Sequence, residues 1–214
     1  MKKRHGHYCP IARTLDVVGD RWSLLILREL LFGDQRFTSL RANLPGISPT
    51  LLSERLQALA AHGLVAIREL PPPAARTVYV ATARARDAVP VLQAMARFGM
   101  DLLPPPRPST KLRPETAAYG AVTPWYDPEA AVGLDEVYRL VVDGREFTLT
   151  SVRGGREAAL AREPDLTLTA PAHVLLAARH GETTLAAALA DGSASARGSK
   201  RALRNFQRIF RLAS

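Results

Sequence analysis

The fold of this chain is decided by residues 36–61, whose sequence is RFTSLRANLPGISPTLLSERLQALAA. Residues 37–44 carry apolar side chains at i, i+3 and i+7, which predicts one amphipathic helix. Pro45-Gly46-Ile47 turns the chain, and Ser48-Pro49 then supplies a capping hydroxyl and a proline at the first helical position. A second helix is therefore expected to run from here to about residue 61. Its buried face holds Leu52, Leu56 and Leu59.

The segments on either side extend these two helices into a larger pattern. Helices are expected over residues 10–18 and 22–31, strands at 64–69 and 77–81, and a long helix over about 86–103. Pro71-Pro72-Pro73-Ala74-Ala75 joins the two strands. Helices, a tight turn, a capped helix and a two-stranded hairpin in this order form the winged helix-turn-helix pattern.

Polar side chains on the capped helix predict contact with duplex DNA. In this pattern the capped helix enters the major groove, and short polar side chains opposite its leucines can reach base edges. The helix N-terminus can bind a phosphate. The predicted DNA-contacting residues are Arg36, Ser48, Pro49, Thr50, Ser53, Glu54, Arg55, Gln57 and Arg76. The alternative is an ordinary solvent-exposed helix face, but the order of turn, cap and hairpin favours DNA binding.

Several short motifs make residues 8–103 resemble the HxlR-type transcriptional regulators. They are Cys9-Pro10, Gly19-Asp20-Arg21-Trp22, Ile26-Leu27-Arg28-Glu29-Leu30, Arg36-Phe37-Thr38-Ser39-Leu40, Gly46-Ile47-Ser48-Pro49, Leu52-Ser53-Glu54-Arg55-Leu56 and Gly63-Leu64-Val65. The resemblance implies a winged-helix fold, a homodimer and sequence-specific binding to duplex DNA, with the wing between the two strands touching the DNA backbone. The chain departs from the family pattern at Ala81, where leucine usually precedes the threonine, and at Ala85, where a glycine normally breaks the chain.

The helix expected over residues 86–103 carries an apolar stripe that a small domain could not cover alone. The stripe consists of Val89, Leu92, Met95, Ala96, Gly99 and Leu102. A second copy covering it would place two recognition helices about one helical turn (~34 Å) apart, which predicts a near-palindromic operator. The alternative is that the second half of the chain covers the stripe, and both arrangements can hold together.

Cys9 is the one cysteine of the chain, and it precedes Pro10 at the start of a helix, close to Arg13. A helix N-terminus and a nearby cation both lower the pKa of a thiol, which allows a reactive thiolate; a buried, inert thiol is the alternative. The resemblance implies that a cysteine at this position can sense oxidants or electrophiles. With one cysteine, the product would be an intersubunit disulfide or a small-molecule adduct.

The sequence predicts no catalytic or metal-binding site. His5, His7 and Cys9 alternate at a spacing that could chelate a soft metal, but a polar tail is expected at a terminus. We find no glycine-rich phosphate loop, nucleophile elbow or paired-carboxylate site in the sequence. We therefore expect neither an enzyme nor a cofactor.

A proline-rich stretch divides the chain. Pro104-Pro105-Pro106-Arg107-Pro108, with Pro114 after it, predicts a linker over residues 104–114. A winged-helix domain is expected over residues 1–103 and a smaller α+β domain over residues 115–214. In the latter, strands are expected at 136–142, 146–152, 166–169 and 194–197, helices at 171–179, 183–189 and 200–212, and turns at Asp143-Gly144 and Gly154-Gly155. The whole chain is thus α+β.

The second half resembles the sterol-carrier-protein-like fold. The resemblance rests on Tyr138-Arg139-Leu140-Val141-Val142-Asp143-Gly144, Asp165-Leu166-Thr167-Leu168-Thr169, Gly181-Glu182 and Gly192 before Arg197-Gly198. It implies an apolar cavity between a curved sheet and its helices, suited to a small hydrophobic effector. The candidate lining residues are Leu140, Val142, Phe147, Leu149, Leu168, Leu175, Leu185, Phe206 and Phe210. The alternative is that these side chains simply fill the core.

Charge and hydropathy narrow the function further. The chain has 214 residues and a net charge of +9, and residues 1–105 hold 14 basic against 8 acidic side chains, which favours a polyanionic partner. No stretch reaches the roughly 18 apolar residues of a membrane span, so a soluble, cytoplasmic protein is expected. The sequence predicts a dimeric, sequence-specific transcriptional regulator, such as a repressor, controlled by a hydrophobic effector or through Cys9. The alternative is a carrier of apolar ligands whose first half only dimerises.

Overall fold

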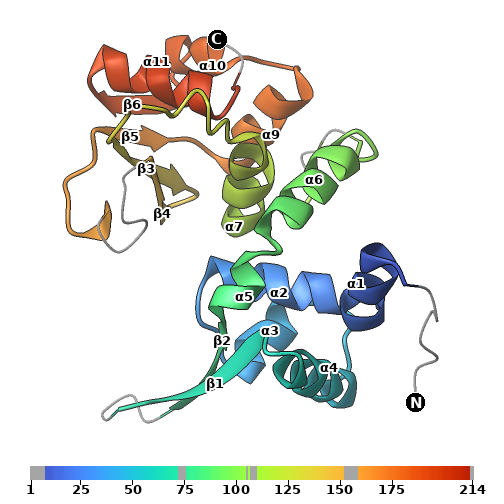
Figure 1. Cartoon of the computed structure of the whole chain (residues 1–214). Coiled ribbons are helices and arrows are strands. Elements are labelled where there is room, and N and C mark those ends of the chain that lie inside the picture. Colours follow the sequence, from blue (N-terminus) through green and yellow to red (C-terminus); the bar gives the residue numbers. More distant parts are fainter. Residues whose placement is uncertain (1–7, 72–75, 105, 107–109, 152–158, 213–214) are drawn as a thin grey trace. The chain divides into compact units, whose positions relative to one another are not determined.

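A computed structural model describes residues 8–71, 76–104, 106, 110–151 and 159–212. The helices and strands of its first part are α1 (Pro10–Val18), α2 (Ser23–Phe32), α3 (Phe37–Asn43), α4 (Pro49–Ala61), β1 (Val65–Leu70) and β2 (Arg76–Ala81) (Figure 1). Each lies within one residue of the bounds that the hydrophobic periodicity predicts. Together they form the winged helix-turn-helix fold that the sequence indicates.

The helices and the hairpin share one apolar core. Its buried members are Val18, Ile26, Leu27, Leu30, Leu40, Leu44, Ile47, Leu52, Leu56, Leu59, Val65 and Ala85. β1 and β2 pair antiparallel from Val65 opposite Ala81 to Leu70 opposite Arg76. Gln35 pairs with Tyr79 of β2 through two backbone hydrogen bonds, of 3.0 and 2.8 Å, which fixes the hairpin to the segment that enters α3. The residues that close the hairpin, 72–75, lie outside the described part of the chain.

The helix expected over about residues 86–103 is present but shorter. It is α6 (Val89–Met100), and a separate short helix that was not expected, α5 (Ala83–Arg86), precedes it. Thr82 caps α5, its hydroxyl accepting a 3.2 Å hydrogen bond from the backbone N–H of Ala85, and the Ala85 side chain is fully buried. Pro90 has no N–H to donate to the carbonyl of Arg86, so the first helix cannot continue into the second.

The chain divides into two compact units, Met1–Leu92 and Gln93–Ser214. The division falls within α6 and therefore earlier than the proline-rich stretch at which the sequence placed the linker. The second part of α6 belongs to the second unit: the Gln93 side chain donates a 3.1 Å hydrogen bond to the carbonyl of Thr123, Arg97 donates to the carbonyl of Pro124, and Met100 is buried in the second core.

A four-stranded sheet organises the second unit. Its strands are β3 (Val137–Val142), β4 (Arg145–Thr150), β5 (Leu166–Thr169) and β6 (Ser195–Gly198), in the spatial order β4-β3-β5-β6. β3 and β4 form the expected hairpin at Asp143-Gly144, whose φ values of 48° and 78° suit this dipeptide. β3 pairs parallel with β5, and β5 pairs antiparallel with β6. The second expected turn, at Gly154-Gly155, lies outside the described residues.

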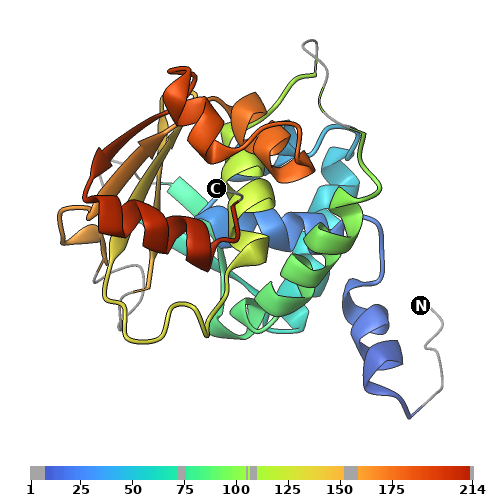
Figure 2. The same cartoon turned by 90° about the horizontal axis from the view of Figure 1, so that it is seen from above.

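Helices cover one face of this sheet, as Figure 2 shows. They are α9 (Ala172–His180), α10 (Leu185–Ala190) and α11 (Lys200–Ile209), close to their expected positions. A further helical segment was not expected from the sequence: α7 (Pro114–Ala117) continues as a π-helix, η1 (Ala118–Val122), and a 3-10 turn, η2 (Thr123–Trp125). Ala117, Ala118, Ala121 and Val122 are fully buried, so small side chains let this segment approach the core closely.

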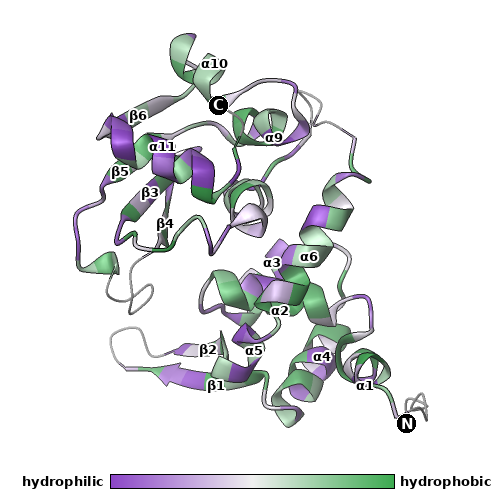
Figure 3. Ribbon diagram, turned by 45° about the horizontal axis from the view of Figure 1, so that its top comes forward, coloured by the Kyte–Doolittle hydropathy of each residue, from purple (hydrophilic) through white to green (hydrophobic). Residues whose placement is uncertain are grey.

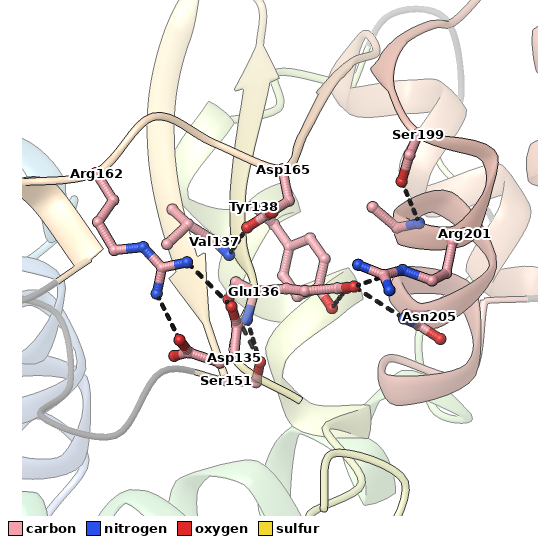
Figure 4. A network of polar contacts seen from close by, with 11 residues as sticks. Asp135, Glu136, Val137, Tyr138, Ser151, Arg162, Asp165, Ser199, Arg201 and Asn205 are labelled. Atoms are coloured by element: carbon pink, nitrogen blue, oxygen red, sulfur yellow. Dashed lines mark hydrogen bonds and ion pairs between the residues drawn. The ribbon is translucent and has the colours of Figure 1, made fainter. Parts of the chain in front are cut away.

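A buried carboxylate ties α11 to the sheet (Figure 4). Glu136, just before β3, accepts hydrogen bonds from the Tyr138 hydroxyl at 2.8 Å and from the Asn205 amide at 3.0 Å. Burial and the adjacent carboxylate of Glu136 raise the pKa of Tyr138. Arg201 lies 3.7 Å from the same carboxylate. Because both oxygens of Glu136 have partners on α11 or β3, this helix is held in one orientation on the sheet.

Candidate nucleic-acid interface

α4 presents a polar face opposite its buried leucines. The Ser48 hydroxyl caps the helix by accepting a 3.2 Å hydrogen bond from the backbone N–H of Leu51, and proline occupies the first helical position. Leu52, Leu56 and Leu59 are buried. The predicted residues on the other side are exposed, except for the half-buried Ser53: they are Pro49, Thr50, Glu54 and Gln57. The structure therefore places seven of the nine predicted DNA-contacting residues on α4 or its cap, and Arg55 is the one of them whose side chain turns to another segment.

The turn before α4 sets the angle between α3 and α4. Gly46 has φ of 92°, a left-handed conformation that glycine adopts without strain. Leu44 and Ile47 flank it and are buried, and the N–H of Ile47 donates a 3.2 Å hydrogen bond to the carbonyl of Leu44. This turn anchors α4 by its two apolar side chains and leaves the N-terminus of the helix exposed.

Arg55 differs from the other predicted contacts, because its side chain turns toward the loop between α1 and α2. Its Nη1 lies 3.6 Å from Oδ2 of Asp20, and only 25% of the side chain is exposed. Among the described residues, its buried Nε has no hydrogen-bond partner. Arg55 therefore holds α4 against the preceding loop, and the structure gives it a packing role that the helix pattern did not reveal.

Asp20 organises that loop. Its Oδ1 accepts the backbone N–H groups of Trp22 at 2.9 Å and Ser23 at 3.0 Å, and its Oδ2 accepts the Ser23 hydroxyl. Burial alone would raise the pKa of Asp20, but these hydrogen bonds and the charge of Arg55 outweigh it, so the pKa lies below its ordinary value of 3.8. The carboxylate is thus ionised and caps the start of α2.

Two arginines predicted outside α4 lie at exposed positions. Arg36 precedes α3 and follows Gln35, the residue paired with the hairpin. Arg76 begins β2, opposite Leu70. Arg41, an exposed cation in the last turn of α3, was not among the residues predicted from the sequence. Its position in the sequence could have predicted a phosphate contact, because α3 is the helix that crosses the DNA backbone in this motif.

The apolar stripe expected on α6 is rotated from its predicted position. Of the predicted residues, Met95 and Leu102 are exposed, while Val89, Leu92, Ala96 and Gly99 are half-buried. Val91 and Phe98, which were not predicted, are also exposed. The exposed stripe therefore consists of Val91, Met95, Phe98 and Leu102, at spacings of three and four residues. A separate exposed stripe, on and before α1, consists of Tyr8, Ile11 and Leu15.

Cys9 occupies the position before the first residue of α1 and is partly exposed. The guanidinium of Arg13, which the sequence analysis placed near it, lies 3.8 Å from Asp16. In the described part of the chain, no three His, Cys, Asp or Glu side chains are grouped as a metal site would require. His5 and His7 lie outside that part.

The nine candidate lining residues of the second unit are buried in one core. Phe206 and Phe210 are in ring contact with each other at 4.9 Å, and with Tyr138 at 5.3 and 6.1 Å. These side chains therefore have one another as packing partners. None of the helices in the described residues combines the length and apolar character needed to cross a membrane.

Comparison with known proteins agrees with this geometry. Residues 17–106 match the family described as HxlR-like helix-turn-helix. The HTH-type transcriptional regulator sll1512 of Synechocystis is 43% identical over 101 residues, which cover 46% of this chain and 73% of the relative. Rv3095 of Mycobacterium tuberculosis, also named an HTH-type transcriptional regulator, is 39% identical over 107 residues, 50% of this chain and 67% of the relative.

Among solved structures, the chain is similar to the reduced form of the transcriptional regulator YodB from Bacillus subtilis. The two are 27% identical in sequence, the match covers 47% of this chain and 100% of the YodB chain, and the TM-score is 0.41. The family match covers the helices α3 and α4, the turn between them and the hairpin that carry the candidate interface, and sll1512 is more than 30% identical over 73% of its own length. The chain therefore belongs to the HxlR-like helix-turn-helix family of transcriptional regulators.

Proposed function

We propose that this regulator binds duplex DNA sequence-specifically as a homodimer, with α4 in the major groove and the β1–β2 hairpin on the phosphate backbone. The observation that carries the proposal is the exposed polar face of α4. Thr50, Glu54 and Gln57 share that face, and each offers a different base contact: a methyl and hydroxyl, an acceptor, and a bidentate amide.

Most contacts to the phosphate backbone come from cations outside α4. Three exposed cations of the same unit are candidates: Arg36 and Arg41 precede α4 in the sequence, and Arg76 follows it. The exposed N-terminus of α4 adds backbone N–H groups that suit a phosphate. Arg55 is assigned to holding the helix, because its charge is already paired with Asp20. Base reading and backbone binding thus belong to different residues.

The exposed stripe of α6 is the proposed dimer contact. Three exposed apolar side chains on α6 and Leu102, two residues after its end, form a surface that a second copy can cover. A two-fold dimer would present two copies of α4 to a near-palindromic site, with half-sites about 34 Å apart.

The test is fluorescence anisotropy of the full chain with duplexes selected by it from a random-sequence library, against scrambled duplexes, over a salt series. We expect preference for the selected duplexes and an affinity that falls as salt rises. Gln57→Ala should cost about 1–3 kcal/mol on the selected duplex and little on the scrambled one. His173→Ala, at an exposed position of α9, is the control. Equal binding of selected and scrambled duplexes by the unmodified protein would contradict the proposal.

We also propose that the second unit or Cys9 controls this binding. A ligand can do so only if its affinity differs between the free and the DNA-bound protein. Titration of fatty acids and sterols into both forms tests the second unit, and mass spectrometry after treatment with an electrophile tests Cys9. The nine candidate lining residues are buried in one core, which is consistent with a packing role for them and gives no separate support to the alternative, an apolar-ligand carrier.

A further inference from the structure

A row of cations covers the outer face of α11 in the second unit. The helix has the sequence KRALRNFQRI, with four basic residues and no acidic one. Lys200, Arg204 and Arg208 recur every four residues and are exposed. They therefore lie along one line on the helix surface, over about 12 Å at 1.5 Å per residue. We call these three residues the α11 stripe; hydrophilic colouring runs along the helix in Figure 3.

The opposite face of the helix holds the stripe in place. Ala202, Phe206 and Ile209 are buried. The Asn205 amide donates to the buried Glu136, and Ser199 caps the helix by accepting a 3.0 Å hydrogen bond from the N–H of Ala202. α11 therefore cannot rotate to hide its cations, and the stripe is a fixed surface of the second unit.

Four other surface arginines of this unit have a carboxylate as counter-charge. Arg139 pairs with Glu146, Arg145 with Glu115, Arg162 with Asp135 and Arg211 with Asp127. Within the described residues, no carboxylate lies within ion-pair distance of Lys200, Arg204 or Arg208.

The arrangement of these cations opposes helix stability. Like charges four residues apart repel each other, and cations in a first helical turn face the positive end of the helix dipole. A bound polyanion would relieve both repulsions.

We propose that the α11 stripe binds the phosphate backbone of duplex DNA that flanks the sequence read by α4. This rests on the proposed function, which brings a duplex to the protein. Guanidinium groups suit phosphate oxygens because they donate two parallel hydrogen bonds. Phosphates of one strand advance about 3.4 Å along the axis, so a 12 Å row of cations reaches about three of them.

The composition of the exposed face selects duplex DNA over two other polyanions. An interfacial membrane helix needs a free apolar face, but α11 buries Ala202, Phe206 and Ile209 in the core and packs the partly buried Leu203 against it. Single-stranded nucleic acid is bound through exposed aromatic rings, and the two aromatic residues of this segment, Phe206 and Phe210, are buried. A row of cations without exposed aromatic side chains beside it suits the phosphate backbone of duplex DNA, which is bound mainly through its negative charge.

The experiment compares the full chain with its variant Lys200→Gln, Arg204→Gln, Arg208→Gln on a selected duplex extended by flanking sequence, in an anisotropy salt series. Glutamine keeps the helix propensity of the replaced residues. Arg201 is left unchanged because it contacts Glu136. Lys111→Gln, Arg139→Gln, Arg162→Gln is the matched control, since it removes the same charge from the same unit. We expect the control to bind as the unmodified chain does, and the stripe variant to bind about 10- to 100-fold more weakly near 0.1 M salt.

The salt dependence supplies the second readout. Loss of three phosphate contacts should make the slope of log affinity against log salt shallower by about 2–3. Lys200→Arg, which keeps the charge, should retain affinity and slope. Unchanged affinity and slope in the stripe variant would overturn this proposal alone, while failure of the unmodified chain to bind any duplex would overturn the proposed function as well. If the stripe variant binds DNA normally but loses binding to vesicles of phosphatidylcholine and phosphatidylserine, the stripe serves a membrane surface and the proposal is wrong.

Discussion

Arg55 shows how a side chain on a recognition helix can serve the core instead of the ligand. The helix pattern places it at the edge of the polar face, from which an arginine can reach either solvent or the protein. The structure directs it toward Asp20, in the loop before α2. Sequence periodicity could not predict this contact, because it describes one helix at a time and the partner lies on another. It did place Thr50, Glu54 and Gln57 correctly, since their exposure depends only on the position of the leucines.

Replacing Arg55 should therefore reduce stability more than base recognition. Arg55→Ala leaves the carboxylate of Asp20 without its cation in a half-buried loop, and we expect a loss of about 1–2 kcal/mol in the free energy of unfolding. The measurement is denaturant unfolding followed by the fluorescence of Trp22, with Trp125→Phe as background. Arg55→Lys, which keeps the charge, is the comparison. Unfolding at the same denaturant concentration as the parent protein would refute the packing role.

The lowered pKa of Asp20 predicts a pH dependence of stability. A carboxyl group whose pKa is lower in the folded protein stabilises it at pH values above the ordinary pKa, and this contribution disappears as the pH falls through the folded-state pKa. The difference in unfolding free energy between the unmodified chain and Asp20→Asn should thus be constant near neutral pH and shrink below the ordinary value of 3.8. Asp87→Asn, at an exposed position of the same unit, is the control. A difference independent of pH would exclude this role of the carboxylate.

At the scale of whole helices and strands, prediction depended on how far the local sequence determines each one. Periodic apolar residues and cap residues located the helices of the first unit and most of the second. Residues 114–125 were missed because alanines, a glycine and two prolines give no clear period, and burial against the sheet decides their structure. The break between α5 and α6 depends on Pro90, which has no N–H to donate. The apolar stripe continues across this position, so the hydrophobic pattern alone predicted a single helix.

Arg179 connects α9 to η1, η2 and the residues that follow α11. Its loss should therefore destabilise the second unit. Its guanidinium donates to the carbonyls of Ala121 at 2.7 Å, Phe210 at 3.0 Å and Arg211 at 3.1 Å, and lies 4.0 Å from the ring centre of Trp125. Burial lowers the pKa of Arg179 to about 10.

Arg179→Ala leaves the carbonyls of Phe210 and Arg211, just after α11, without the donor that this guanidinium provides. We expect a loss of about 2–3 kcal/mol in the free energy of unfolding. The fluorescence of Trp125 in a Trp22→Phe background reports it. Arg162→Ala, which removes an exposed arginine of the same unit, should change little, and equal unfolding midpoints for both variants would contradict the assignment.

For the whole molecule, the exposed stripe of α6 predicts the oligomeric state. Phe98, 72% exposed, lies within that stripe. Phe98→Glu should convert a dimer into a monomer in sedimentation velocity and weaken binding to a near-palindromic duplex by about 100-fold or more, because the two half-sites are then bound independently. Val132→Glu changes a side chain that is 79% exposed outside any helix and should leave the dimer intact. A dimeric Phe98→Glu protein would move the interface elsewhere, for example to the stripe of Tyr8, Ile11 and Leu15.

The helix α6 lies in both units. Its residues up to Leu92 belong to the first unit, and Gln93, Arg97 and Met100 belong to the second, although the family match covers the whole helix. A fragment cut at the proline-rich stretch would therefore lack three side chains that the second unit uses, so a separately produced second unit has to begin before residue 93.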